Sequence, residues 1–319
     1  MASFNADLLD DLARQRVVLF LGAGVSSSAT TRAGGRIKGW ERFLIDACDA
    51  VEQGLSTQVR QLIEAKDFLL ASELLQQALG EVWERMIIEE FGQMADPSEL
   101  HDATISLDQR IILTTNFDKL IEVSWEAKLG NDTHLPRVVS SLDAGHFSIL
   151  KDHRGKYLVK IHGTVDNPNN IVFSRSDYIR LAFGNPTYTA FLEVLLLSYT
   201  FVFIGFSMDD PAIVSLMEMY ALRYPKSRPH YILSPKGRPD NILEINRRLR
   251  KLLAIQYEPD ASHSHLPPLL RDLAEQMRQK RREIFAAGLS SMAEKSEMSS
   301  GEVVEQPDAS LPNGGNIEE

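Results

Sequence analysis

Four short apolar runs, each ended by glycine or polar residues, constrain the fold of this chain more than any other feature. They are rich in Val, Ile, Leu and Phe, as strands buried on both faces of a sheet are. Stretches of helical periodicity separate them. This alternation predicts an α/β protein with a mostly parallel sheet. The runs and the residues that follow them are Val17–Leu21 before Gly22–Ser26, Ile111–Thr114 before Thr115–Asp118, Tyr157–Ile161 before His162–Thr164, and Phe201–Ile204 before Gly205–Ser207.

Two further regions complete the predicted organisation. From Trp40 to Phe91 the periodicity is helical almost throughout, which predicts a helical insertion at about 40–95 between the first two strands. The last predicted helix spans Leu266–Ala287 and ends near Gly288. Residues 288–319 are rich in Ser, Glu, Gly, Asn and Pro, so we expect an acidic disordered tail after a domain at 1–287.

Charge and cysteine content narrow the class of protein. The formal net charge is −10, and residues 286–319, with one basic and seven acidic residues, carry most of it. An acidic body lacks the Lys and Arg excess that non-specific nucleic-acid binding requires. Cys48 is the one cysteine, which excludes an internal disulfide and a cysteine-ligated zinc site. The chain does not start like a signal peptide and has no apolar run of membrane-spanning length, so we expect a cytoplasmic protein without membrane contact.

The ends of the first two runs hold candidate ligand-binding residues, because open parallel sheets bind ligands beyond the carboxyl ends of their strands. The Gly22–Ser26 loop is either a phosphate site, with backbone amides close to the ligand, or a plain tight turn. The Asn116 amide can orient a hydroxyl or a water molecule. The Asp118 carboxylate either accepts hydrogen bonds from ribose hydroxyls or caps the helix that follows it.

The ends of the other two runs repeat this pattern. His162 is a candidate general base, although a histidine after a strand is often a structural residue. Gly205 and Ser207 are placed to approach a nucleotide. Asp209 and Asp210 precede a proline, which is typical of the start of a helix, so we interpret both as caps.

Taken in order, these motifs resemble the sirtuin superfamily, and most closely its bacterial branch found in antiphage defence systems. The motifs are Gly-Ala-Gly-Val-Ser at 22–26, Thr-Asn-Phe-Asp at 115–118, Lys-Ile-His-Gly at 160–163 and Gly-Phe-Ser-x-x-Asp-Pro at 205–211. The resemblance implies a Rossmann-like fold that binds NAD⁺. It implies His162 as the catalytic base, Asn116 and Asp118 at the nicotinamide ribose, and dinucleotide contacts from Gly22, Ala23, Gly24, Ser26, Gly205, Ser207 and Ser234.

Two departures from the deacylating sirtuins change the expected reaction. Residues 163–203 contain no cysteine, so the four-cysteine zinc module that follows the catalytic histidine in those enzymes is missing. The Gly-Ile-Pro-x-Phe-Arg loop is also missing, and Thr30–Arg36 stands in its place. We therefore expect an NAD⁺ glycohydrolase without zinc that acts by NAD⁺ depletion. Two alternatives stay open: an NAD-dependent deacylase, and a non-catalytic module that binds NAD⁺ or ADP-ribose.

The resemblance also bears on partners. An enzyme that depletes NAD⁺ must be restrained, and no sensor domain is visible in the sequence. We expect a homo-oligomer and an activating partner protein of nuclease, helicase-like ATPase or Argonaute type.

Overall fold

A seven-stranded parallel sheet forms the centre of the molecule in the computed structural model, which describes residues 3–129, 135–182 and 184–301. The order is β5-β6-β4-β1-β7-β8-β9, and every neighbouring pair is parallel. This confirms the predicted α/β class. The strands are β1 (Val17–Leu21), β4 (Ile111–Thr114), β5 (Arg137–Val139), β6 (Tyr157–Lys160), β7 (Thr200–Ile204), β8 (His230–Pro235) and β9 (Leu252–Tyr257).

Helices cover both faces of this sheet, which is why its strands are continuously apolar. Alternate residues of β1 enter two different cores: Leu19 belongs to one cluster and Phe20 to the other. The first core also contains side chains from α1 (Ala6–Ala13), α7 (Glu99–Ile105), α8 (Leu120–Leu129) and α13 (Leu266–Gly301). The second contains side chains from α10 (Pro186–Ser198) and α11 (Pro211–Arg223).

The centre of the sheet fixes the position of the site. Strand β1 pairs with β4 on one side and with β7 on the other, although both come much later in the chain. The order in which strands are added to the sheet therefore reverses at β1. Such a switch point leaves a crevice at the carboxyl ends of the strands. The loops after β1, β4, β6 and β7 meet at this edge, as the four sequence runs predicted.

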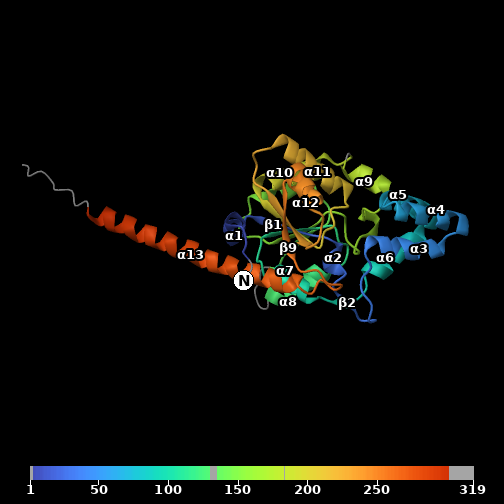
Figure 1. Cartoon of the computed structure of the whole chain (residues 1–319), viewed down its shortest axis with the longest axis horizontal. Helices are drawn as coiled ribbons and strands as arrows, with labels where there is room; N and C mark the ends of the chain where they lie inside the picture. The colour runs from blue at the N-terminus through green and yellow to red at the C-terminus, as the bar shows by residue number, and fades with distance from the viewer. Residues whose placement is uncertain (1–2, 130–134, 183, 302–319) are drawn as a thin grey trace, which may run out of the picture.

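Four helices between β1 and β4 build a third core. They are α3 (Trp40–Ala47), α4 (Gln53–Glu64), α5 (Phe68–Leu79) and α6 (Glu81–Phe91), and they lie together at one end of the molecule, on the right in Figure 1. Their aromatic side chains Phe43, Trp83 and Phe91 pack around Phe173, which belongs to the segment after β6. The helical insertion is present between β1 and β4, and the single domain at 1–287 that contains it stays a prediction.

The remaining elements are short or peripheral. A small antiparallel pair, β2 (Thr30–Thr31) with β3 (Ala95–Asp96), joins the two ends of the helical insertion and was not predicted. The other helices are α2 (Ala23–Ser26), α9 (Arg175–Ala182), α12 (Asp240–Arg250) and the 3-10 helices Cys48–Ala50, Ala144–Leu150 and Pro168–Asn170.

The last helix differs from the prediction. Helix α13 does not end near Gly288 but continues to Gly301, and it projects from the body on the side opposite α3–α6 (Figure 1). A glycine costs a helix only about 1 kcal/mol relative to alanine, and the Ala, Met, Glu and Lys residues after Gly288 favour helix. The predicted disorder is therefore wrong for residues 288–301, and the rest of the predicted tail, residues 302–319, lies outside the described part of the chain.

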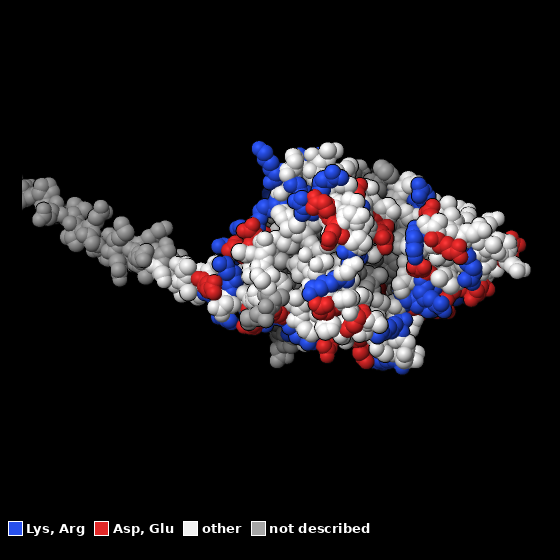
Figure 2. Space-filling model, in the orientation of Figure 1, with Lys and Arg blue, Asp and Glu red and all other residues white. Residues whose placement is uncertain are grey.

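The surface of the described chain agrees with the mixed charge of the body. In Figure 2 basic and acidic side chains are interspersed over the visible face, without a broad field of one sign. Among the described helices, none has the length and apolarity needed to cross a membrane.

Candidate functional site

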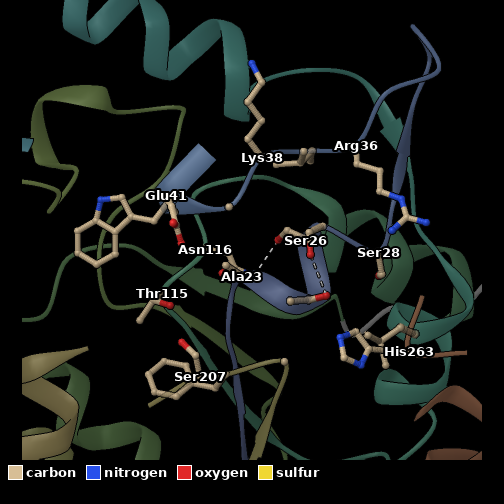
Figure 3. A pocket seen from close by; sticks show the side chains of 18 of the residues that line it. Ala23, Ser26, Ser28, Arg36, Lys38, Glu41, Thr115, Asn116, Ser207 and His263 are labelled. Atoms are coloured by element: carbon tan, nitrogen blue, oxygen red, sulfur yellow. Dashed lines mark hydrogen bonds between the residues drawn. The ribbon is translucent and has the colours of Figure 1, made fainter. Parts of the chain in front are cut away.

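A large cavity lies at the carboxyl edge of the sheet. Its volume is about 950 Å³, at the upper end of the range for small-molecule sites. One wall comes from the loops after β1, β4, β6 and β7, and the facing wall comes from residues 36–42, whose Arg36, Lys38 and Glu41 lie across the view from Thr115 and Ser207 in Figure 3. The segment after β9 also lines the cavity. Eight of the ten predicted site residues line it: Ala23, Gly24, Ser26, Asn116, Asp118, His162, Gly205 and Ser207.

Two predicted residues lie outside this wall. The loop glycine Gly22 packs behind it, and Ser234 is buried with 2% exposure while its neighbours Leu233 and Pro235 line the cavity. Successive side chains of a strand point to opposite faces, so Ser234 points away when Leu233 and Pro235 do not. Ser234 therefore does not line this cavity, and its contact with a ligand stays a prediction.

The glycines after β1 serve close packing against the loop after β7. A β-carbon on Gly22 would lie 2.6 Å from the Gly205 carbonyl oxygen, and one on Gly24 would lie 2.9 Å from it. The Gly24 amide donates to the same oxygen at 2.9 Å. Gly205 itself has φ +60°, a conformation that glycine adopts at little cost. Close packing in a tight turn thus explains these glycines. The Gly24 amide already donates a hydrogen bond within the protein.

Asn116 is fixed by hydrogen bonds to the first loop. Its side-chain nitrogen donates to the Gly22 carbonyl oxygen at 2.9 Å and to the Ser26 hydroxyl at 2.8 Å (Figure 3). Its side-chain oxygen accepts no hydrogen bond from the described residues, and Asn116 lines the cavity. Both amide donors are therefore occupied, whereas the amide oxygen is left to accept a hydrogen bond from a ligand or a water molecule.

Asp118 supports this arrangement and also caps a helix. One carboxylate oxygen accepts from the Ser26 hydroxyl at 2.5 Å, and the other accepts from the Leu120 amide at 3.0 Å at the start of α8. The side chain is 3% exposed. The capping interpretation is confirmed, and the carboxylate has a second structural role because it orients the hydroxyl that holds Asn116.

Lys160, a buried cation, ties β6 to the Asn116 loop. Its ammonium donates to the carbonyl oxygens of Phe117 at 3.2 Å and Asp118 at 2.5 Å, and to the Glu122 carboxylate at 2.7 Å. Its side chain is 0% exposed. Burial raises the pKa of Glu122, and the neighbouring Lys160 opposes that shift. The lysine of the Lys-Ile-His-Gly motif thus fixes the backbone of the Asn116 loop through the two carbonyl groups that follow Asn116.

His162 has a different environment, with few partners. It is 3% exposed, and the edge of its ring meets Tyr178 at a centroid distance of 5.1 Å. Its Nε2 atom lies 3.5 Å from Oδ2 of Asp210 and makes no hydrogen bond with a described residue. Burial lowers the pKa of His162, and the Asp210 carboxylate acts in the opposite direction. The ring is therefore neutral near pH 7, as a general base must be.

The facing wall is cationic, but most of its charge is paired. Lys38 binds Glu90 at 2.7 Å and Asp46 at 3.1 Å, and Arg42 binds Asp46 at 3.1 Å. Arg36 makes no ion pair with a described residue, and in Figure 3 it lies on the same side of the view as Ser28 and His263. Arg36 is therefore the cation on this wall that is most available to an anionic ligand.

Metal ligands are not grouped in the part of the chain that the structure describes. No set of three or more His, Cys, Asp or Glu side chains there is arranged to hold an ion. The single cysteine, Cys48, is buried among the helices of the third core.

Sequence reasoning missed three residues of the site. Asp210 was interpreted only as a helix cap, Tyr178 was not considered, and Lys160 was noted only as part of a motif. One signal was present: Asp210-Pro211 follows the fourth strand closely, so its carboxylate had to lie at the same sheet edge as His162. Nothing in the sequence indicated that Tyr178 reaches Asp210.

Comparison with known proteins agrees with this geometry. Residues 110–257 match the family described as SIR2-like domain. The chain is 26% identical over 255 residues to "NAD(+) hydrolase ThsA" of Bacillus cereus (strain MSX-D12), covering 78% of this chain and 50% of that protein. It is 27% identical over 234 residues to the Enterococcus faecium protein of the same name, covering 71% and 44%.

A third relative has a different name. "Defense-associated sirtuin 2" of Bacillus subtilis is 24% identical over 200 residues, which cover 61% of this chain and 18% of that protein. The chain thus spans half or less of the length of these relatives. The order of the motifs and the parallel sheet agree with the similarity of residues 110–257 to the SIR2-like domain family.

Proposed function

We propose that this chain is an NAD⁺ glycohydrolase that cleaves NAD⁺ to nicotinamide and ADP-ribose and acts in a bacterial antiphage defence system by depleting NAD⁺. Relatives named NAD(+) hydrolase and defence-associated sirtuin support this proposal. The observation that carries it is the state of Asn116. Both of its donors are held by Gly22 and Ser26, so its acceptor oxygen is presented to a cavity that His162 also lines.

Cleavage of the bond between nicotinamide and ribose requires little acid catalysis from the protein. Nicotinamide in NAD⁺ is a cationic leaving group, and its departure from the ribose passes through an oxocarbenium-like state. The protein must orient the ribose and supply a positioned nucleophile. Asn116 holds the attacking water through its amide oxygen. His162 accepts a proton from that water or from a ribose hydroxyl, a contribution typically worth about 10²–10⁴-fold.

Asp118 acts indirectly in this scheme. Its two oxygens already bind Ser26 and Leu120, so its role is to keep Asn116 in place through the Ser26 hydroxyl. Arg36 and Arg238 can bind the negative pyrophosphate, because both line the cavity without an ion pair to a described residue, whereas Lys38 and Arg42 are paired with Asp46 and Glu90. Gly205 and Ser207, from the loop after β7, line the same cavity and are available to the dinucleotide.

Regulation is part of the proposal. A depleting hydrolase must stay inactive until it is triggered, so we propose a homo-oligomer restrained or activated by a partner protein of nuclease, helicase-like ATPase or Argonaute type. The proteins that copurify with the full chain, together with its mass in solution, test this point.

The test of the activity is release of nicotinamide and ADP-ribose from NAD⁺, measured by chromatography with the protein alone and with its partner. Asn116→Ala and His162→Ala should each lower turnover by at least 10²-fold. Matched controls are Asn241→Ala and His265→Ala, which remove exposed side chains outside the cavity lining and should leave turnover unchanged.

Three results would contradict the proposal. Full turnover in either site variant would remove the assigned residue from catalysis. Nicotinamide release that depends on an acylated peptide would indicate a deacylase. Tight NAD⁺ binding without turnover under every activating condition would indicate a non-catalytic module.

A further inference from the structure

The surroundings of His162 contain a carboxylate with an unusual set of bonds. Asp210 is the N-cap of α11, and its Oδ1 atom accepts from the amides of Ala212 and Ile213 at 3.0 and 3.1 Å. Its Oδ2 atom accepts from the Tyr178 hydroxyl at 2.8 Å. Asp210 is 7% exposed and Tyr178 is 6% exposed. Three bonds therefore fix this carboxylate in a position where one oxygen faces His162.

The facing atom of His162 is a nitrogen without a partner. Nε2 lies 3.5 Å from Oδ2 of Asp210, and among the described residues no acceptor or donor satisfies it. A normal N–H···O hydrogen bond measures 2.7–3.2 Å, so the two groups are close but not bonded. Catalytic hydrogen bonds are often long in unliganded proteins and shorten when substrate binds.

We infer that Asp210 is the positioning residue of His162: it keeps the imidazole proton on Nε2, so that Nδ1 faces the cavity as the base, and it stabilises the imidazolium formed when Nδ1 takes up a proton. This inference rests on the proposed hydrolase function for its catalytic meaning. A buried carboxylate behind a histidine acts in this way in nucleophilic hydrolases, where it selects the tautomer and stabilises the cation. Tyr178 fixes the carboxylate and takes part of its charge.

Among the described residues, Asp210 is the only ionised group that faces His162. Tyr178 comes from α9, and Tyr188 comes from α10 and faces Asp210. Burial and the neighbouring carboxylate raise the pKa of both phenols well above the ordinary value. Both are therefore neutral across the working pH range, and removal of the Asp210 charge changes His162 without competition from another ion.

The decisive variant is Asp210→Asn. Asparagine has nearly the same size and is an equally good N-cap, so α11 should stay intact. We expect kcat to fall at least tenfold with little change in KM. The acid limb of the kcat profile should move to lower pH, because His162 loses the charge that favours its protonated form. In Tyr178→Phe the carboxylate keeps its full charge, and the acid limb should move to higher pH.

A second readout does not depend on activity. Histidines labelled at ¹³Cε1 give a titration for each ring, and His162→Asn identifies the signal of interest. Its midpoint should be lower in Asp210→Asn and higher in Tyr178→Phe than in the wild type. Asp240→Asn removes an exposed carboxylate from the first turn of α12 and should leave the midpoint unchanged.

The outcomes separate the two proposals. An unchanged His162 midpoint in Asp210→Asn overturns the inference, and so does a fall in kcat without a shift of the acid limb. If the His162 midpoint shifts in Asp210→Asn while the wild-type protein hydrolyses no NAD⁺, the His162–Asp210 pair is supported and the proposed function is contradicted.

Discussion

The surroundings of Asn116 and those of His162, on two sides of the cavity, differ in how many of their polar groups are hydrogen-bonded within the protein. On the Asn116 side, the amide nitrogen, the Ser26 hydroxyl and both Asp118 oxygens have partners within 3.0 Å. Lys160 adds three further bonds from beneath. On the His162 side, Nε2 makes no hydrogen bond with any residue that the structure describes, and it faces a carboxylate at 3.5 Å.

This difference separates two catalytic requirements. A group that orients a nucleophile must be rigid before substrate arrives, because its geometry determines the rate. A group that accepts a proton must change charge during the reaction, so a fully bonded ring would resist that change. The Asn116 side meets the first requirement and the His162 side meets the second. The following predictions test each side, beginning with the largest effect.

Lys160→Met should cause the greatest loss of stability. It leaves the buried Glu122 carboxylate and the carbonyl oxygens of Phe117 and Asp118 without their cation, and breaking a buried pair typically costs about 3–5 kcal/mol. Chemical denaturation measures the loss. The double variant Lys160→Met/Glu122→Leu, which removes both charges, should recover a large part of it. A loss below about 1 kcal/mol in the single variant would show that the Asn116 side is not held by this cation.

Ser26→Ala should have a smaller effect on stability and a clear effect on rate. The change removes the hydroxyl that bridges Asn116 and Asp118, at a cost of about 1–3 kcal/mol. Asn116 keeps only its bond to Gly22, so kcat should fall on the order of 10-fold to 10²-fold. Ser106→Ala is the control, because that hydroxyl bonds a helix carbonyl in α7. Wild-type kcat in Ser26→Ala would mean that Asn116 needs no bridge.

Acid should weaken the fold through two buried histidines, and the carboxylates of Asp118 and Asp102 only partly oppose the effect of burial on the pKa of one of them, His101. Burial lowers the pKa of His230 to about 3 and that of His101 to about 4. Each ring binds a proton in the unfolded chain near pH 6.5 but not in the folded one. The stability that each contributes is therefore complete above pH 6.5 and declines as the pH falls toward the folded pKa, by about 1.4 kcal/mol per pH unit and histidine.

His230→Asn isolates this effect. Asparagine can retain the bond that the Phe201 amide donates to His230, but it does not titrate. Urea denaturation between pH 6.5 and 4.5 should show a shallower pH dependence in this variant, by about one proton. The same slope as in the wild type would place the proton uptake elsewhere. His162, which faces Asp210, should contribute less to the slope than His230 does.

Sequence reasoning succeeded where strand ends alone determine position. Asn116 and His162 each follow a buried apolar run, and parallel strands place their carboxyl ends at one edge, so both reach the same cavity. Ser234 was expected at the site but does not line this cavity, since motif order cannot give the face of the strand to which a side chain points. Sequence reasoning also placed the end of the last helix too early, because a single glycine such as Gly288 ends a helix only when no helix-forming residues follow.

The sequence by itself determined the parallel sheet, the loops at its carboxyl edge and the sirtuin-like order of motifs, because these depend on local hydrophobicity and chain order. Tertiary structure decided which groups meet across that edge. Tyr178 on α9 reaches Asp210 before α11, and the Gly24 amide after β1 reaches the Gly205 carbonyl oxygen after β7. Such contacts join residues tens to nearly two hundred positions apart, and only the packing of helices on the sheet sets their distances.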